Sequence, residues 1–230
     1  LLTTLVNRPI EAASIAVKEG QKIGFMGDSI TQAGAEPQGY VTLVIRGLEA
    51  NGIQATAVPA GISGHKSNQM LERLERDVLA KQPQWMTLSC GVNDVWHGDN
   101  GVPLEDYKKN ITSIVDQAQA AGIKVVILTS TMIGEDQSNA NNQKLVSYND
   151  FLRALAKEKK CLLADLNADM QAALAEAEQA RFEFEKAQAL RKMAAAEERA
   201  AEKARAARNL AEMRIAQAQA DQAAARLGLV

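Results

Sequence analysis

A serine near the start of the chain occupies a position from which it could act as a nucleophile. The residues "GDSIT", from Gly27 to Thr31, come directly after the apolar run "KIGFM". A serine at the carboxyl end of a strand can attack an acyl carbon if a base takes its proton. The alternative is that Ser29 or Asp28 only caps a helix, which is a common use of both residue types. These five residues alone leave both interpretations open.

Two further loops contain groups that could stabilise an oxyanion. "PAGISGHKS" follows the second predicted strand and "SCGVNDVWHG" follows the third. The backbone N–H groups of Ser29 and Gly64 and the side-chain amide of Asn93 would together supply three donors to the oxygen that becomes negative in acyl transfer. Each loop could also be an ordinary turn, because Gly, Ser, Asn and Asp are frequent in turns. Since the three loops follow successive strands, we predict that they form one site.

The segments that must position these loops alternate between strand and helix patterns. The predicted strands are Lys22–Met26, Ile53–Pro59, Trp85–Cys90, Lys124–Thr129 and Cys161–Leu166, and the predicted helices are Gly39–Ala50, Asn68–Lys81, Leu104–Ala121 and Asn141–Lys159. The strands are apolar at successive positions, which is typical of a parallel sheet covered on both faces. We predict an α/β fold with three layers, in which a flavodoxin-like parallel five-stranded sheet has the order 2-1-3-4-5. Residues 1–18 are expected to form a helix or arm packed on the outside.

The composition changes after Asn167. From Ala168 to Leu227 there is no glycine or proline, and Ala, Glu, Gln, Arg and Lys, which favour helices, dominate. We therefore predict an α/β domain over residues 1–170 and a long C-terminal α-helical extension over 171–230. The lack of turn residues favours one rod over a hairpin. Large apolar residues are too sparse for a heptad seam, so two interpretations stay open: helices that pair in a homo-oligomer through alanine, and a solvated single helix.

Composition argues against several classes of partner. The net charge is −2, which gives no electrostatic reason to expect nucleic acid or an anionic membrane surface. The longest apolar run, "IKVVILTSTMI", is strand-sized, so no membrane span is expected. The chain shows no signal-peptide pattern, so any targeting segment was removed or never present, and no compartment is assigned.

The cysteines and histidines do not predict a metal site. Cys90 and Cys161 should lie at opposite edges of a parallel sheet, too far apart for a disulfide. We expect both to be buried free thiols. Two scattered histidines and two distant cysteines make no zinc site, and the lysine of a phosphate-binding loop is missing after "GFMGDS". The sequence therefore predicts no metal and no cofactor.

The three motifs resemble those of the SGNH (GDSL-type) hydrolase family, over about residues 20–170. "GDSIT" resembles the first block, "GISG" the second and "GVND" the third. The resemblance implies a flavodoxin-like fold and serine esterase activity, that is, hydrolysis of carboxylic esters with Ser29 as nucleophile and an oxyanion hole that includes Gly64 and Asn93. It also implies acyl ester substrates, among them acetylated carbohydrates, thioesters and lysophospholipids. We expect a small-molecule acyl ester.

One part of the family pattern is missing. The family has an Asp and a His, spaced D-x-x-H, near its C-terminus, but here the alanine-rich helix continues from about Glu176. The only histidines are His65 and His97. His97 is a candidate auxiliary base, His65 a weaker one, and Asp28 is expected to fix the loop.

Two hypotheses follow from this gap. The first is a serine esterase impaired by the missing base. The second is an inert hydrolase body that serves as a scaffold through its tail, as a fusion or engineered chimera would; whether the chain is an enzyme therefore stays open. Loss of the family's last helix should also uncover one face of the sheet. Met170, Leu174, Phe182 and Phe184 are the residues we expect to cover that face.

Overall fold

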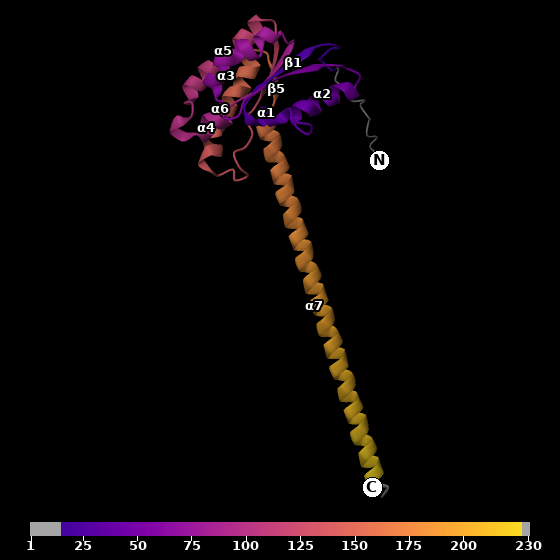
Figure 1. Ribbon diagram of the computed structural model, residues 1–230. Coiled ribbons are helices and arrows are strands. Elements are labelled where there is room, and N and C mark those ends of the chain that lie inside the picture. Colours follow the sequence, from indigo (N-terminus) through magenta and orange to yellow (C-terminus); the bar gives the residue numbers. More distant parts are fainter. Residues whose placement is uncertain (1–14, 227–230) are drawn as a thin grey trace, which may run out of the picture. The chain divides into compact units, whose positions relative to one another are not determined.

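The computed structural model describes residues 15–226, and a five-stranded parallel sheet lies at its centre (Figure 1). The strands are β1 (Lys22–Gly27), β2 (Thr56–Gly61), β3 (Trp85–Ser89), β4 (Lys124–Leu128) and β5 (Leu162–Ala164). Their order is β2-β1-β3-β4-β5, and every pair is parallel. The predicted fold class and strand order are confirmed.

Helices cover the two faces of the sheet unequally. They are α1 (Ser29–Gly34), α2 (Tyr40–Ala50), α3 (Ser67–Asp77), α4 (Val92–Trp96), α5 (Leu104–Ala120) and α6 (Ala140–Glu158), with short 3₁₀ helices at Leu79–Lys81 and Gly98–Asn100. Crossovers between parallel strands are right-handed, so the three steps from β2 to β5 place α3, α5 and α6 on one face. The single step from β1 to β2 runs the other way and places α1 and α2 on the opposite face (Figure 1).

The buried apolar side chains form two clusters, one for each face. The larger cluster joins the sheet to α3, α5 and α6, as illustrated by Leu74, Ile114 and Leu152. The smaller cluster has Phe25 and Val41 among its four buried members, and α2 supplies its helical side. The first face is therefore a full core, whereas the second is covered mainly over β1 and β2.

The structure departs from the predicted elements in several places, and the predicted helix Asn68–Lys81 is divided into α3 and the 3₁₀ helix Leu79–Lys81. The short helices α1 and α4 were not predicted, because both begin inside the motif loops and are too short to show a helical period. Strand β2 starts at Thr56 rather than Ile53, and β5 is only three residues long. Cys90 is buried, but Cys161 is half-buried, because it lies just before β5 at the rim of the sheet; both thiols are free. Of the predicted N-terminal arm, residues 1–14 lie outside the described residues.

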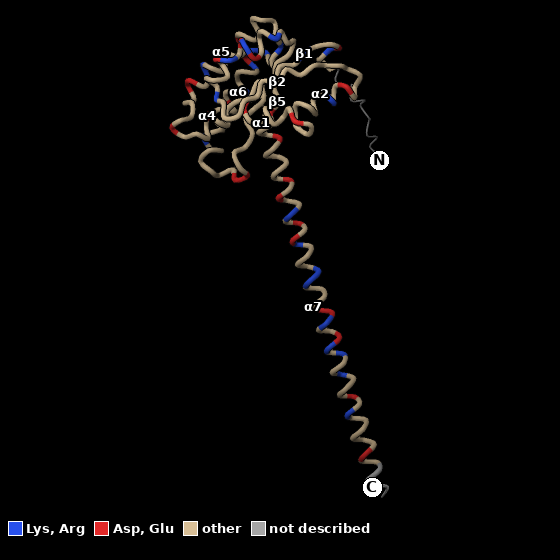
Figure 2. Tube along the Cα trace, viewed as in Figure 1, with Lys and Arg blue, Asp and Glu red and all other residues tan. Residues whose placement is uncertain are grey.

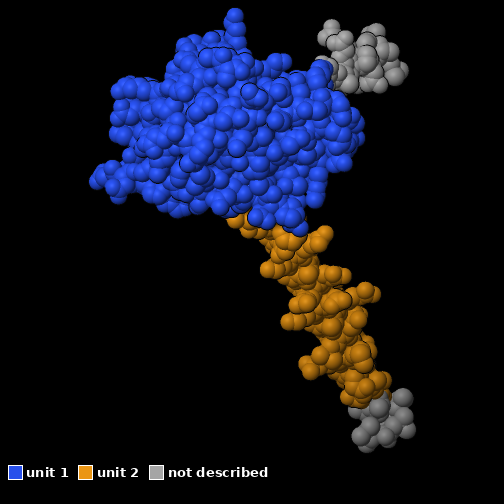
Figure 3. Space-filling model, turned by 45° about the horizontal axis from the view of Figure 1, so that its top comes forward, with its two compact units in different colours: residues 1–172 blue, residues 173–230 orange. Residues whose placement is uncertain are grey.

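The C-terminal part is one helix, α7 (Leu166–Arg226), of 61 residues. It contains no turn, so the rod is present rather than the hairpin. Basic and acidic residues are interspersed along its whole length (Figure 2). The chain divides into two compact units, residues 1–172 and 173–230, which Figure 3 shows in different colours. Within the described residues, no helix combines the length and the apolar character that crossing a membrane requires.

Candidate active site

Ser29 is the first residue of α1 and its side chain is exposed. The helix is capped by its neighbour: the Asp28 carboxylate accepts a hydrogen bond of 2.9 Å from the backbone N–H of Ile30. Asp28 itself is only 2% exposed. Capping is therefore the task of Asp28, which leaves the Ser29 hydroxyl free to face a substrate.

Glycine is favoured at positions 27 and 64 for two different reasons, lack of space at Gly27 and backbone conformation at Gly64. A Cβ on Gly27 would collide with the side chain of Thr31, because the first turn of α1 folds back against the end of β1. Gly64 has a φ of +76°, in the left-handed region that favours glycine. It lies in the loop after β2, and this loop is joined to α1 by a 2.7 Å bond from the Ser63 N–H to the Gln32 side chain.

Asn93 connects the third motif loop to the other two. It lies in α4 and is 9% exposed. Its side-chain amide donates to the Asp28 carboxylate at 3.4 Å and to the His65 carbonyl at 3.2 Å. The three predicted loops therefore meet at one edge of the sheet, where the strands end. The bond to Asp28 is the longer of the two.

A buried arginine, which the sequence analysis did not identify, donates hydrogen bonds to the ends of β1 and β2 and to the loop after β2. Arg73 on α3 is 4% exposed and donates 2.8 Å bonds to the carbonyls of Gly27 and Ala60. Its Nε donates to the ring of His65 at 3.2 Å, and its charge is paired with Asp77 at 3.0 Å. One guanidinium thus bonds both the backbone before Ser29 and the residue after Gly64.

A signal for Arg73 was present in the sequence. Met70 and Leu74 are buried on the inner face of α3, and Arg73 falls between them on the same face. A charged residue on the apolar face of a helix is rarely buried unless it is paired. Such a residue close to a motif loop is therefore a candidate for a positioning role.

Asp94, next to Asn93, anchors the third loop, and among residues 15–226 it forms no ion pair with a cationic side chain. It is fully buried, and one carboxylate oxygen accepts bonds from the Ser67 N–H at 3.0 Å and the Ser67 hydroxyl at 2.6 Å. Burial raises the pKa of Asp94, and the Ser67 bonds oppose that rise only in part. Burial likewise raises the pKa of Asp28, and the nearby Asp94 adds to the effect.

The two histidines differ in which ring nitrogen can accept a proton. His65 Nδ1 accepts the bond from Arg73, so its neutral ring carries the proton on Nε2 and cannot take another there. Burial, followed by the charge of Arg73, lowers the pKa of His65. His97 is exposed, and its Nδ1 lies 2.9 Å from the Asn93 carbonyl. Because a carbonyl only accepts, the neutral His97 ring donates from Nδ1 and has its Nε2 free.

The described residues offer no ready metal site. Between residues 15 and 226, no three His, Cys, Asp or Glu side chains come together in a way that could hold a metal ion.

Comparison with known proteins agrees with the fold and the motifs. The model of the GDSL-like Lipase/Acylhydrolase family matches residues 25–186. The chain belongs to this family. The match continues ten residues past Glu176, where the sequence analysis placed the end of the family pattern.

Several esterases resemble this GDSL-like chain. It is 27% identical to an acetylxylan esterase of Geobacillus stearothermophilus over 172 residues, which are 66% of the chain and 78% of that protein. It is 33% identical to the esterase TesA of Pseudomonas aeruginosa over 110 residues, which are 47% of the chain and 53% of TesA. These relatives support an esterase or acylhydrolase function.

Solved structures give the same result. The acetyl xylan esterase AlAXEase is 36% identical with a TM-score of 0.66, over 69% of this chain and 83% of that one. Axe2, an acetylxylan esterase of Geobacillus stearothermophilus, is 26% identical with a TM-score of 0.65, over 70% and 83%. Two structures of Axe2 are of catalytic mutants, in which alanine replaces a histidine in one and a serine in the other.

Proposed function

We propose that this chain hydrolyses small acyl esters, including acetylated carbohydrates, with Ser29 as the nucleophile. The observation that carries the proposal is that Asp28 caps α1, so the Ser29 side chain is left exposed at the edge where the Gly64 and Asn93 loops meet. In this proposal the N–H groups of Ser29 and Gly64 and the Asn93 amide hold the oxyanion. The acetylxylan esterases among its relatives support a carbohydrate ester as substrate.

In this proposal, the rate of turnover is limited by how well a base can accept the proton of Ser29. The serine proton needs an acceptor, and in Axe2 a histidine belongs to the catalytic residues. His97 is the residue that we assign to this role, because its Nδ1 faces the Asn93 carbonyl and its Nε2 is left to accept. It has no carboxylate to stabilise the imidazolium that would form, since its partner is a neutral carbonyl. We therefore expect a slow enzyme.

A scaffold function is the second candidate, and the tail carries it. Large side chains such as Phe182 and Phe184 are 59% and 64% exposed on α7. These two aromatic side chains are the largest apolar groups of α7, and packing against a second helix would bury them. We propose that α7 assembles copies of the chain. Light scattering on the full chain at increasing concentration tests this directly, and a constant monomer mass would contradict it.

The experiment that tests the esterase proposal is hydrolysis of p-nitrophenyl acetate by the full chain and three variants. Ser29→Ala should reduce the rate at least tenfold, and His97→Ala should reduce it by a similar factor. Ser63→Ala, which removes an exposed hydroxyl in the neighbouring loop, should leave the rate unchanged. In triad hydrolases, loss of the base lowers kcat by a factor on the order of 10⁶. The remaining rate is still roughly 10³–10⁴ times that of the uncatalysed reaction in water.

The variants also separate the hypotheses. If the full chain and Ser29→Ala hydrolyse the ester at the same rate, Ser29 is not a working nucleophile. If Ser29→Ala is inactive but His97→Ala is not, the serine acts without His97, and the assignment of the base is wrong.

A further inference from the structure

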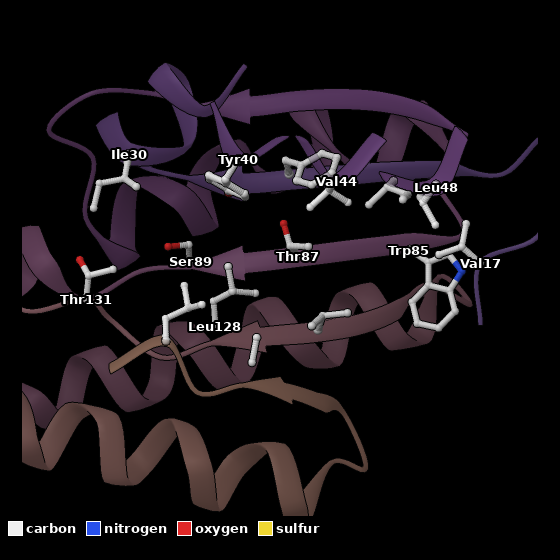
Figure 4. Close-up of a pocket in the computed structure, with 15 residues that line it drawn as sticks. Val17, Ile30, Tyr40, Val44, Leu48, Trp85, Thr87, Ser89, Leu128 and Thr131 are labelled. Atoms are coloured by element: carbon white, nitrogen blue, oxygen red, sulfur yellow. The ribbon is translucent and has the colours of Figure 1, made fainter. Parts of the chain in front are cut away.

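The second face of the sheet has a large apolar groove. Because the crossovers place only α1 and α2 on this face, the strands β3, β4 and β5 are left without a helix of their own there. The groove has a volume of about 580 Å³ (Figure 4). Its wall contains Val44 of α2, Trp85 of β3, Val126 and Leu128 of β4, and Ala164 of β5, and none of its lining residues is charged.

This groove is too large to be a packing defect. Protein interiors have few voids larger than one water molecule, and at about 30 Å³ per water this volume would hold roughly twenty. Apolar side chains on its rim are exposed, with Ile30 at 41% and Val44 at 42%. A contiguous apolar surface of this kind marks a place where something else binds.

The chain itself indicates what binds there. The segments that connect the strands already form α1 to α6. Only the segments before β1 and after β5 are therefore left to cover the remainder of this face. The segment before β1 already does so: Val17 lines the groove and packs against the cluster that contains Phe25 and Trp85 (Figure 4). Residues 1–14 are therefore attached to the chain only a few residues before the groove.

We propose that residues 1–14 bind in this groove and complete the second face of the sheet. Their sequence, "LLTTLVNRPIEAAS", contains five large aliphatic residues, and its two charges, Arg8 and Glu11, cancel. Fourteen residues can reach about 46–50 Å, while the five residues of β3 span about 17 Å. The segment is thus long enough to follow the groove from the Trp85 end to the Ile30 end.

The test uses the full chain with a photo-crosslinking phenylalanine derivative in place of Val44. After irradiation, mass spectrometry should find Val44 joined to residues 1–14 of the same chain, at the mass of a monomer. The matched control places the same group at Val146, which is 51% exposed on α6, over the opposite face. This control should give no link to residues 1–14.

Other crosslinks would overturn the proposal. A link from Val44 to α7 would assign the groove to the C-terminal helix, and a link at the mass of a dimer would assign it to a second copy. A small-molecule adduct without a peptide link would assign it to an apolar ligand.

A second measurement does not depend on crosslinking. The double substitution Leu5→Ser with Val6→Ser should uncover the groove and raise the fluorescence of a bound hydrophobic dye such as ANS at least threefold. Leu210→Ser with Ile215→Ser, which alters two exposed residues of α7, should raise it by much less. If the unaltered chain already binds the dye as strongly as the Leu5/Val6 variant, residues 1–14 do not cover the groove.

Discussion

The two compact units of this chain are stabilised in opposite ways. In residues 1–172, side chains such as Leu74 and Ile114 are fully buried, and polar groups bond partners far away in the sequence, as Arg73 does with Gly27. In residues 173–230, even large side chains such as Leu190 and Met213 are 58% and 70% exposed. The side-chain bonds of this unit join residues four apart, such as Gln179 with Glu183.

This difference shows that two residues of the same type can contribute very different amounts to the free energy of unfolding, depending on the unit in which they lie. A buried residue with several partners cannot be removed without leaving polar groups unpaired or a cavity behind. A residue on an exposed helix contributes mainly its own helix propensity. The second unit is therefore expected to tolerate substitutions that the first does not.

The largest difference between the two units is expected when one arginine in each unit is replaced by alanine. Arg73→Ala would leave the Gly27 and Ala60 carbonyls unpaired in the interior, and should lower the free energy of unfolding by about 3 kcal/mol or more. Arg199→Ala, on the exposed part of α7, should change it by less than about 0.5 kcal/mol. Urea unfolding followed by tryptophan fluorescence measures the first effect, because both tryptophans lie in the first unit, and the helical circular dichroism signal measures the second. Equal effects of the two substitutions would contradict the comparison.

A smaller effect, which depends on pH, is expected at Asp94. Its pKa is raised in the folded protein, so the folded state holds this proton more tightly than the unfolded state does. Stability should therefore fall as the pH rises above the unfolded value of about 4. Asp94→Asn keeps an oxygen for the two Ser67 bonds and removes the charge. The gain in unfolding free energy from this substitution should be larger at pH 7 than at pH 4.

Asp165 provides a control of opposite sign for that experiment. Its hydrogen bonds with Arg153, at 2.8 and 3.0 Å, hold its pKa below the usual range. The stability that this gives is present above about pH 4 and is lost as the pH falls through the lowered pKa. Asp165→Asn should therefore cost about 1–3 kcal/mol at pH 7 and less at pH 3. Identical pH dependence in the Asp94 and Asp165 variants would contradict both assignments.

The smallest effect on the folding of the first unit is expected from a substitution in the tail. Ala195→Gly should destabilise α7 locally by about 1 kcal/mol through helix propensity alone. It should reduce the helical signal in circular dichroism on heating but leave the urea midpoint of the first unit unchanged. A shift of that midpoint would show that the two units unfold together.

The fold could be predicted from the sequence because the patterns that indicate strands and helices are local. The strands and the helices between them follow from apolar runs and from glycines at helix ends, and the order 2-1-3-4-5 was taken from flavodoxin-like folds, which have five such strands. The motif loops were placed correctly because each directly follows a strand. Their roles in catalysis stay predictions.

Features that depend on distant contacts were not predictable in the same way. The bonds of Arg73 to Gly27 and His65 join residues that are 46 and 8 positions apart, and only the folded backbone brings them together. The tautomers of His65 and His97 depend on single partners at about 3 Å. The two short helices α1 and α4 were not predicted either, because five or six residues are too few to show a helical period.

The unequal burial of the two thiols has a practical consequence for labelling. Cys90 is buried and its pKa is raised well above the ordinary value by burial and by Asp94 next to it, so its thiolate is scarce as well as shielded. Cys161 is half-buried, and burial raises its pKa as well. An Ellman titration should therefore count one thiol, reacting slowly, in the folded protein and two after unfolding. A maleimide dye should consequently mark a single site, next to β5, without any engineering of the chain.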